Sequence, residues 1–158
     1  MHFALLLLLA LQAPAATPSP ATDHDPFAAL RDQWAKDLHG KFVEDSLAQY
    51  APDADFISDT GRTHGMAALR QLFTTITKTF DSDLAFTSQR VEVSGDLAYD
   101  SGTYKETLLN RATGKTQNMA GDYLTVYRRT KAPNGNALWL IVEQVWTGGE
   151  QQGTGNRQ

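Results

Sequence analysis

The sequence has no cysteine, so disulfide bonds cannot stabilise the fold and no cysteine is available for a lipid anchor. Positive charge is also scarce, with 14 Lys and Arg against 18 Asp and Glu and a formal net charge of −4. The basic residues are dispersed, whereas binding to nucleic acid or to an anionic membrane needs a concentrated basic surface. We therefore expect no nucleic acid as a partner, and no membrane once an N-terminal signal has been removed.

Several chemical motifs are missing as well. Thr113-Gly114-Lys115 resembles the end of a phosphate-binding loop, but it lacks the upstream glycine and the strand-to-helix setting. There is no nucleophile elbow. No pair of His or carboxylate residues has metal-ligand spacing supported by a third ligand. We expect no metal and no other cofactor.

The only long apolar run lies at the N-terminus. Residues 3–11 have the length of the hydrophobic segment of a secretory signal peptide and are too few to span a bilayer. Ala13-Pro14-Ala15 supplies the small residues that a signal peptidase recognises. We predict a periplasmic or secreted protein with a signal peptide (1–15), a linker (16–25), one folded domain (26–148) and a flexible tail (149–158).

Helical spacing dominates the first half of the predicted domain. Asp25-Pro26 is typical of a helix start, and the apolar residues that follow recur at helical spacing until Gly40. A second, shorter helix is expected to present Tyr50 on its apolar face and to end at Pro52. The clearest amphipathic pattern in the chain follows Gly65 and predicts a third helix that ends near residue 80.

The second half has the pattern of strands joined by tight turns. Asp59-Thr60-Gly61 indicates a turn after an early short strand, and Ser94-Gly95-Asp96 indicates another. Two hairpin loops are also indicated, at Arg111-Ala112-Thr113-Gly114-Lys115 and, more strongly, at Pro133-Asn134-Gly135-Asn136. Helices come first and long strands come last, an order that favours an α+β fold with helices packed on one face of an antiparallel sheet. The expected strands are 54–58, 84–93, 97–109, 116–129 and 138–146.

Two groups of residues carry a resemblance to a known superfamily. The first is the run from Gln49 through Tyr50-Ala51-Pro52-Asp53-Ala54-Asp55 to Phe56, followed by Gly61 and Gly65. The second comprises Gly121-Asp122-Tyr123, Tyr127-Arg128-Arg129, Trp139-Leu140-Ile141-Val142 and Trp146. Across residues 27–147 this order resembles SnoaL-like polyketide cyclases and nuclear-transport-factor-2-like domains. The resemblance implies a cone-shaped, curved antiparallel sheet, about three N-terminal helices on its concave face, an internal pocket and a homodimer formed through the sheet.

The same superfamily contains ketosteroid isomerases, which use a carboxylate base, a tyrosine and a neutral carboxylic acid. At the matching positions this sequence has Trp34 for the tyrosine and Ser58 for the base, and the acid falls near Tyr123. None of the three roles is filled in register. Because proton abstraction beside a carbonyl needs both a base and donors for the developing charge, we reject steroid isomerisation as the leading interpretation.

Asp59 and His64 remain as candidate catalytic bases. Asp59 can reach a pocket if its strand ends one residue early, although an Asp in a Ser-Asp-Thr-Gly turn also has a purely structural use. His64 stands near the expected pocket mouth, but it can equally be a polar surface residue before the third helix. Asp55 and Phe56 alternate on one strand, and we expect Phe56 to face inward because an unpaired buried carboxylate is costly.

Regular alternation assigns two faces to the last strand. The face that includes Val142, Gln144 and Trp146 is expected to line the cone, while Trp139 and Ile141 point outward toward a dimer partner. Simple core packing on both faces is the alternative.

We predict that the domain binds a small, mainly apolar molecule. The alternatives are a cofactor-independent lyase, hydratase or isomerase acting on a cyclic substrate, and a dimeric interaction module. The predicted ligand-binding residues are Trp34, Phe56, Ser58, Tyr123, Val142, Gln144 and Trp146.

Overall fold

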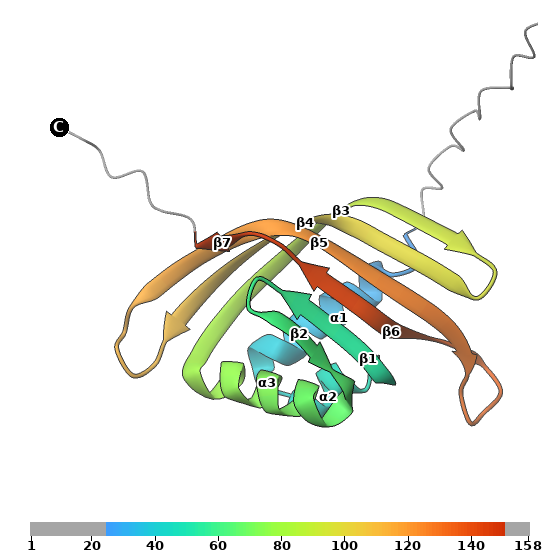
Figure 1. The fold of residues 1–158 in the computed structure, drawn as a ribbon, viewed down its shortest axis with the longest axis horizontal. Coiled ribbons are helices and arrows are strands. Elements are labelled where there is room, and N and C mark those ends of the chain that lie inside the picture. Colours follow the sequence, from blue (N-terminus) through green and yellow to red (C-terminus); the bar gives the residue numbers. More distant parts are fainter. Residues whose placement is uncertain (1–24, 151–158) are drawn as a thin grey trace, which may run out of the picture.

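A computed structural model describes residues 25–150 of the chain. Its helices lie beneath an arched sheet, so that the concave side of the sheet is filled and the convex side is open (Figure 1). The predicted α+β cone fold is confirmed. The helices are α1 (Ala28–Gly40), α2 (Val43–Leu47) and α3 (Gly65–Thr79), and the strands are β1 (Tyr50–Ser58), β2 (Gly61–His64), β3 (Phe80–Ser94), β4 (Leu97–Asn110), β5 (Thr116–Lys131), β6 (Ala137–Trp146) and β7 (Gly149–Glu150).

The sheet has the strand order β2-β1-β6-β5-β4-β3, and β7 adds to β5. Every neighbouring pair is antiparallel except β1 and β6, which run parallel. The sheet is therefore mixed, and the expectation of a purely antiparallel sheet is wrong for this pair. The long hairpins β3–β4 and β4–β5 match the predicted turns, because each turn is local in sequence, whereas the β1–β6 pairing joins the two ends of the domain.

The boundary between α2 and β1 differs from the prediction. Tyr50 is the first residue of β1 and not the last of a helix, and Pro52 lies inside the strand. The register between β1 and β6 shifts between Tyr50 and Asp55, so Pro52 occupies a stretch where a regular ladder hydrogen bond is not required. Strand β2, which pairs with β1 through Ser58 and Gly61, was not predicted.

Aromatic side chains fill the space between α1, α3 and the sheet. Trp34 of α1 lies edge-to-face with Trp146 of β6, with ring centroids 5.8 Å apart. Phe73 of α3 is 1% exposed and contacts Trp34 and Phe56 in the same way. Such pairs are favourable beyond the area they bury, and they fix the helices against the sheet.

A bulge in β6 changes which residues face inward. Tyr127 pairs with Ile141 and Val126 pairs with Glu143, so Val142 is an extra residue on the β6 side. Before the bulge, Ile141 is 3% exposed, and Trp139 packs edge-to-face on Phe27 at 5.5 Å. The expectation that Trp139 and Ile141 point outward is therefore wrong, because strict alternation does not survive the bulge.

Two further findings concern the ends of the chain and membranes. The predicted signal peptide and linker, apart from Asp25, lie outside the described residues, as does the predicted tail after Glu150. Gly149 and Glu150 themselves pair with β5. None of the helices in residues 25–150 is long and apolar enough to cross a membrane.

Candidate functional site

A pocket of about 370 Å³ lies between α3, the β1–β2 turn and the inner faces of β4 and β5. Its volume is in the range of sites that hold small organic ligands. The lining residues are mainly apolar and come from helices and strands alike. They are Trp34, Leu38, Phe56, Ser58, Asp59, Thr60, Leu72, Phe73, Ile76, Phe80, Tyr104, Glu106, Leu108, Met119, Trp146 and Gly148.

Helix α3 supplies one wall of this pocket because its apolar stripe faces the sheet. Leu69 and Phe73 are fully buried in the core, while Leu72 and Ile76, at the edge of the stripe, border the pocket. Four predicted ligand-binding residues line the pocket, namely Trp34, Phe56, Ser58 and Trp146. Phe56 faces inward, as expected.

Asp59 also lines the pocket, at its mouth. The side chain that closes its turn is Ser58, whose Oγ lies 2.8 Å from Oγ1 of Thr60 and accepts a hydrogen bond from the Thr60 backbone N–H at 3.3 Å. Among the ion pairs of residues 25–150, none involves Asp59. Turn closure therefore leaves the Asp59 carboxylate available to the pocket.

Glu106 is a second carboxylate in the pocket, and the sequence interpretation missed it. Its Oε1 accepts a hydrogen bond of 2.6 Å from Ser82 Oγ. Burial raises the pKa of Glu106, and the Ser82 hydrogen bond offsets this only in part. Alternation along β4 could have revealed this residue, because Tyr104, Glu106 and Leu108 share the inward face.

The phenol of Tyr104 is influenced by the charges of both carboxylates, Asp59 and Glu106. Burial raises the pKa of its phenol, and the charges of Glu106 and Asp59 raise it further. Both acids therefore act on the same side chain even though they come from different parts of the sheet. The Tyr104 ring lies 4.4 Å from that of Trp146, whose Nε1 is buried without a hydrogen-bond partner among the described residues.

His64 lies elsewhere. Its ring is largely exposed, and Nδ1 is 2.9 Å from Oδ1 of Asp55. Arg62 binds the other oxygen of Asp55 at 2.6 Å. The structure thus places His64 in an ion-pair cluster on the outside of the β1–β2 hairpin, and it does not bring His64 together with Asp59 in the pocket.

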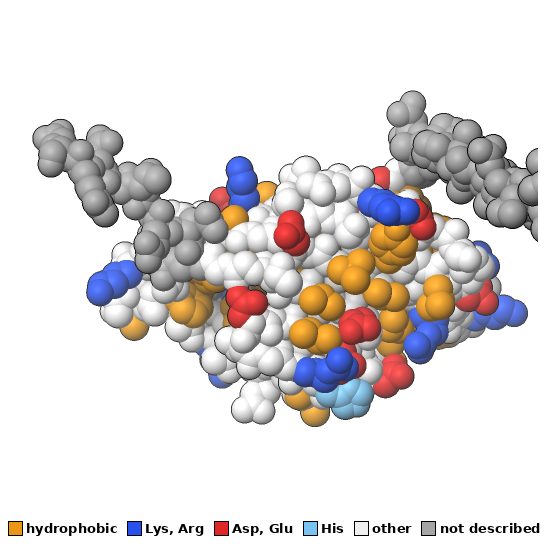
Figure 2. All heavy atoms as spheres, turned by 45° about the horizontal axis from the view of Figure 1, so that its top comes forward, with side chains coloured by type: hydrophobic (Ala, Val, Ile, Leu, Met, Phe, Trp, Pro, Cys, Tyr) orange, Lys and Arg blue, Asp and Glu red, His pale blue; other side chains and the backbone are white. Residues whose placement is uncertain are grey.

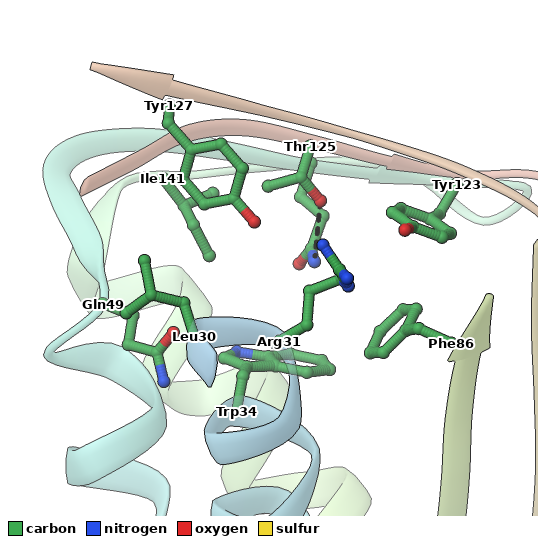
Figure 3. A pocket seen from close by; sticks show the side chains of 10 residues that line it. Leu30, Arg31, Trp34, Gln49, Phe86, Tyr123, Thr125, Tyr127 and Ile141 are labelled. Atoms are coloured by element: carbon green, nitrogen blue, oxygen red, sulfur yellow. Dashed lines mark hydrogen bonds between the residues drawn. The ribbon is translucent and has the colours of Figure 1, made fainter. Parts of the chain in front are cut away.

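Tyr123 faces a different, much smaller cavity (Figure 3), which Gln144 also lines. At about 10 Å³ it has room for nothing larger than a water molecule. Gln144 is 3% exposed, accepts a hydrogen bond from the Tyr50 hydroxyl and donates one of 3.4 Å to Thr125. Val142, the extra residue of the β6 bulge, lines neither cavity. These three predicted residues therefore do not join the main pocket.

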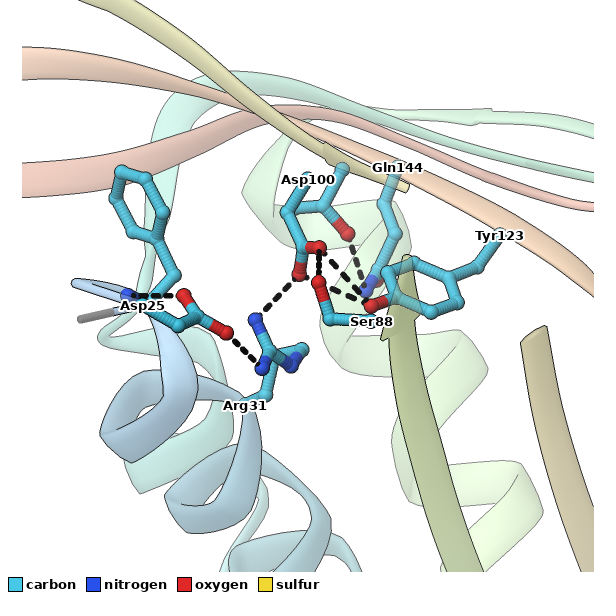
Figure 4. Close-up of polar contacts among 8 residues, drawn as sticks. Asp25, Arg31, Ser88, Asp100, Tyr123 and Gln144 are labelled. Atoms are coloured by element: carbon cyan, nitrogen blue, oxygen red, sulfur yellow. Dashed lines mark hydrogen bonds and ion pairs between the residues drawn. The ribbon is translucent and has the colours of Figure 1, made fainter. Parts of the chain in front are cut away.

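A buried polar network adjoins this small cavity, since Arg31 and Tyr123 belong to both (Figure 4). Asp100 is 0% exposed and binds Arg31 of α1 at 2.6 Å. Ser88 and Tyr123 donate hydrogen bonds to the same carboxylate at 2.5 Å and 3.0 Å. Burial and the negative charge of Asp100 raise the pKa of Tyr123, so its hydroxyl remains a donor. With Asp25 on the outer side of Arg31, this network ties α1 to the sheet.

The described residues contain no group of three or more His, Asp or Glu side chains that could hold a metal ion. The acids of the main pocket are Asp59 and Glu106, and its uncharged polar groups are hydroxyls and indole N–H groups. This arrangement can bind an apolar molecule, donate hydrogen bonds to it and exchange protons with it.

Comparisons with known proteins identify the family. The family model of the SnoaL-like domain matches residues 30–132. No curated protein has a significantly similar sequence. Among solved structures, a ketosteroid isomerase-like protein from Erwinia carotovora atroseptica SCRI1043 is 20% identical, with a TM-score of 0.65 over 76% of this chain and 91% of that chain.

Two other solved structures share the fold. A nuclear transport factor 2-like superfamily protein from Salmonella enterica serovar Typhimurium LT2 is 22% identical, with a TM-score of 0.65 over 81% of this chain and 92% of that chain. A conserved protein from Planctomyces limnophilus DSM 3776 is 13% identical, with a TM-score of 0.69 over 78% and 93%. At these identities the likeness establishes the fold alone.

Proposed function

The chain belongs to the SnoaL-like domain family, and from that premise we propose that it binds a small, mainly apolar molecule in the pocket beneath Trp146. The observation that carries the proposal is the pocket itself, about 370 Å³ with walls of aromatic and aliphatic side chains. Protein interiors are otherwise close-packed, and an apolar hollow of this size costs stability when nothing fills it. A ligand that accepts a hydrogen bond from Trp146 Nε1 would also satisfy a buried donor.

A filled-pocket variant tests this proposal. Ile76 borders the pocket from α3, so Ile76→Trp should occupy the site, whereas Gln71→Trp adds the same side chain at an exposed position of the same helix. In a thermal-shift and calorimetric screen of hydrophobic compounds, we expect saturable binding to the wild type and to Gln71→Trp but not to Ile76→Trp. If no compound binds saturably, or if Ile76→Trp binds as well as the wild type, the proposal is wrong.

A second candidate is a cofactor-independent lyase, hydratase or isomerase that acts on a cyclic substrate. It is favoured by the two carboxyl groups in one pocket, with Glu106 held in a partly buried site that favours its protonated form and Asp59 at the mouth. Carboxyl groups in unequal environments can divide the roles of acid and base. In this proposal Asp59 accepts the proton and Glu106 donates one.

Single substitutions separate binding from catalysis. With a converted substrate in hand, Asp59→Asn and Glu106→Gln should lower kcat by about 100-fold or more, because each removes a proton-transfer group while keeping its shape. Binding of the substrate, measured by calorimetry, should change much less. His64→Ala tests the other predicted base: a comparable loss of kcat in this variant, with Asp59→Asn active, would assign the role to His64.

We also propose that the protein is exported and forms a homodimer through the outer face of its sheet. The apolar N-terminal run of the sequence supports export, and sequencing of the mature N-terminus tests it.

The proposed dimer surface is a shallow apolar depression on the outer face of β4 and β5, lined by Leu97, Tyr99, Leu124 and Val126. Hydrophobic side chains gather there, bordered by charged ones (Figure 2). Continuous apolar surface of this kind is typical of protein interfaces.

A further inference from the structure

The main pocket has charge of only one sign. Asp59 and Glu106 line it, and no Lys, Arg or His among residues 25–150 does. Neither acid forms an ion pair with a basic side chain of the described chain. The Arg, Lys and His residues of the ion pairs bind other Asp and Glu residues, and none of them lines this pocket. Asp59 at the exposed mouth and the half-buried Glu106 therefore both lack a positive partner, and for Glu106 burial makes this lack costly whenever the side chain is ionised.

This charge pattern discriminates among ligands of similar shape. A carboxylate or phosphate would be repelled by Asp59 and would have no cation to bind. A neutral ligand would fill the apolar volume but leave the carboxylates unpaired. A cation would supply the missing partner, and hydrogen bonds to charged groups are stronger than those between neutral groups.

The aromatic lining favours the same choice. Four aromatic side chains border the pocket, and the faces of such rings attract a cation. They are Trp34, Phe80, Tyr104 and Trp146. Leu72, Ile76, Leu108 and Met119 offer an apolar surface to the rest of the molecule. A ligand with one positive end and a hydrophobic body matches both kinds of surface.

We propose that this pocket is specific for a hydrophobic amine, whose ammonium group pairs with Asp59 and Glu106 while its apolar part contacts α3 and the aromatic side chains. The inference rests on the proposed function, that the pocket is a binding site, and adds the chemical class of its ligand. It requires neither catalysis nor dimer formation.

Two matched series of probes test the inference. The first is 4-phenylbutylamine, 4-phenylbutan-1-ol and 4-phenylbutanoic acid, and the second is decylamine, decan-1-ol and decanoic acid, each below its aggregation concentration. Calorimetric titration of the full chain at neutral pH should show the amine binding about tenfold more tightly than the alcohol, with the acid weakest. Added salt should weaken binding of the amine and leave binding of the alcohol unchanged.

Variants that each neutralise one carboxylate show whether the pocket acids are the groups that bind the amine. Glu106→Gln and Asp59→Asn should each lower the affinity for the amine several-fold and leave that for the alcohol unchanged. Asp53→Asn removes one negative charge at an exposed position of β1 outside the pocket and should leave both affinities unchanged. Equal losses in all three variants would show that only the overall charge matters, and the inference would be overturned.

Failure of the amine inference can be distinguished from failure of the proposed binding function. If alcohol and amine bind equally in both series, with Ile76→Trp abolishing both, the amine inference fails while the proposed binding function stands. If the acid binds most tightly, the inference also fails. If no probe of either series binds, and the broader hydrophobic screen is negative as well, both proposals fail together.

Discussion

Asp100 shows how much of this protein's architecture depends on single buried polar residues. Its carboxylate receives Arg31 from α1, Ser88 from β3 and Tyr123 from β5, so one side chain joins three elements. The sequence analysis singled out Tyr123 but predicted none of the contacts of Asp100, because a strand pattern places an Asp on one face of the sheet and does not reveal its partners. Glu106 was missed for the same reason, although alternation along β4 would have put it inside.

Replacing Asp100 should therefore destabilise the fold strongly. Asp100→Asn leaves the partly buried Arg31 with only Asp25 as a counter-charge, and breaking a buried pair in this way typically costs about 3–5 kcal/mol. Asp96→Asn is the matched control, since the Asp96–Arg129 pair is exposed and should contribute at most about 1 kcal/mol. The free energies of unfolding from urea titrations give the comparison. Equal losses in the two variants would contradict a structural role for the network.

Glu106 should make stability depend on pH in a defined direction. Because burial raises its pKa above the usual value of 4.5, the folded state holds this proton more firmly than the unfolded state does. The stabilisation is fully present below pH 4.5 and is lost as pH rises through the raised pKa of the folded state. Glu106→Gln, which stays neutral, should thus be more stable than the wild type at neutral pH, with a flatter profile above pH 4.5. Urea denaturation between pH 4 and 8 checks this, and an unchanged profile would contradict it.

Whole elements were easier to predict than their irregularities. The turns at Gly114 and Gly135 identified the β4–β5 and β5–β6 hairpins because positive φ angles of 68° and 83° favour glycine locally. The bulge at Val142 has no such signal, since it depends on the register between β5 and β6. Pro52 likewise suggested a helix end, whereas the irregular β1–β6 pairing accommodates it within a strand.

The bulge predicts which residues of β6 contribute most to stability. Regular alternation would put Val142 inside and Ile141 outside, but Ile141 is 3% exposed. Ile141→Ala should therefore cost about 2–5 kcal/mol, as for other buried aliphatic residues. Val145→Ala, on the outer face after the bulge, should cost clearly less in the monomeric state. Free energies of unfolding measured at low protein concentration decide between the two patterns, and a larger loss for Val145→Ala would contradict the bulge.

At the scale of the whole molecule, the order of helices and strands was sufficient to predict an α+β fold with its helices on one face of the sheet, because the helices must bury their apolar stripes against it. The cone shape and the internal pocket were expected only from the resemblance to the SnoaL-like superfamily. The contents of that pocket were less predictable. Trp34, Phe56, Ser58, Asp59 and Trp146 were identified because each lies near a recognisable motif, whereas Tyr104 and Glu106 lie in the middle of a long strand. The curvature that brings them to Asp59 arises from the assembled sheet.

The convex face leads to a last prediction, on assembly. Leu124 is 36% exposed and lines the apolar depression on β4 and β5, so a charge there should prevent two sheets from packing together. Leu124→Arg should convert the proposed dimer into a monomer in light scattering coupled to size exclusion. Phe42→Arg is the control, because Phe42 is 59% exposed but lies between α1 and α2, on the helical side of the molecule. Because the main pocket opens on the concave side, the Leu124→Arg monomer should still bind the hydrophobic amine, whereas a wild-type protein that stays monomeric at high concentration would contradict the dimer itself.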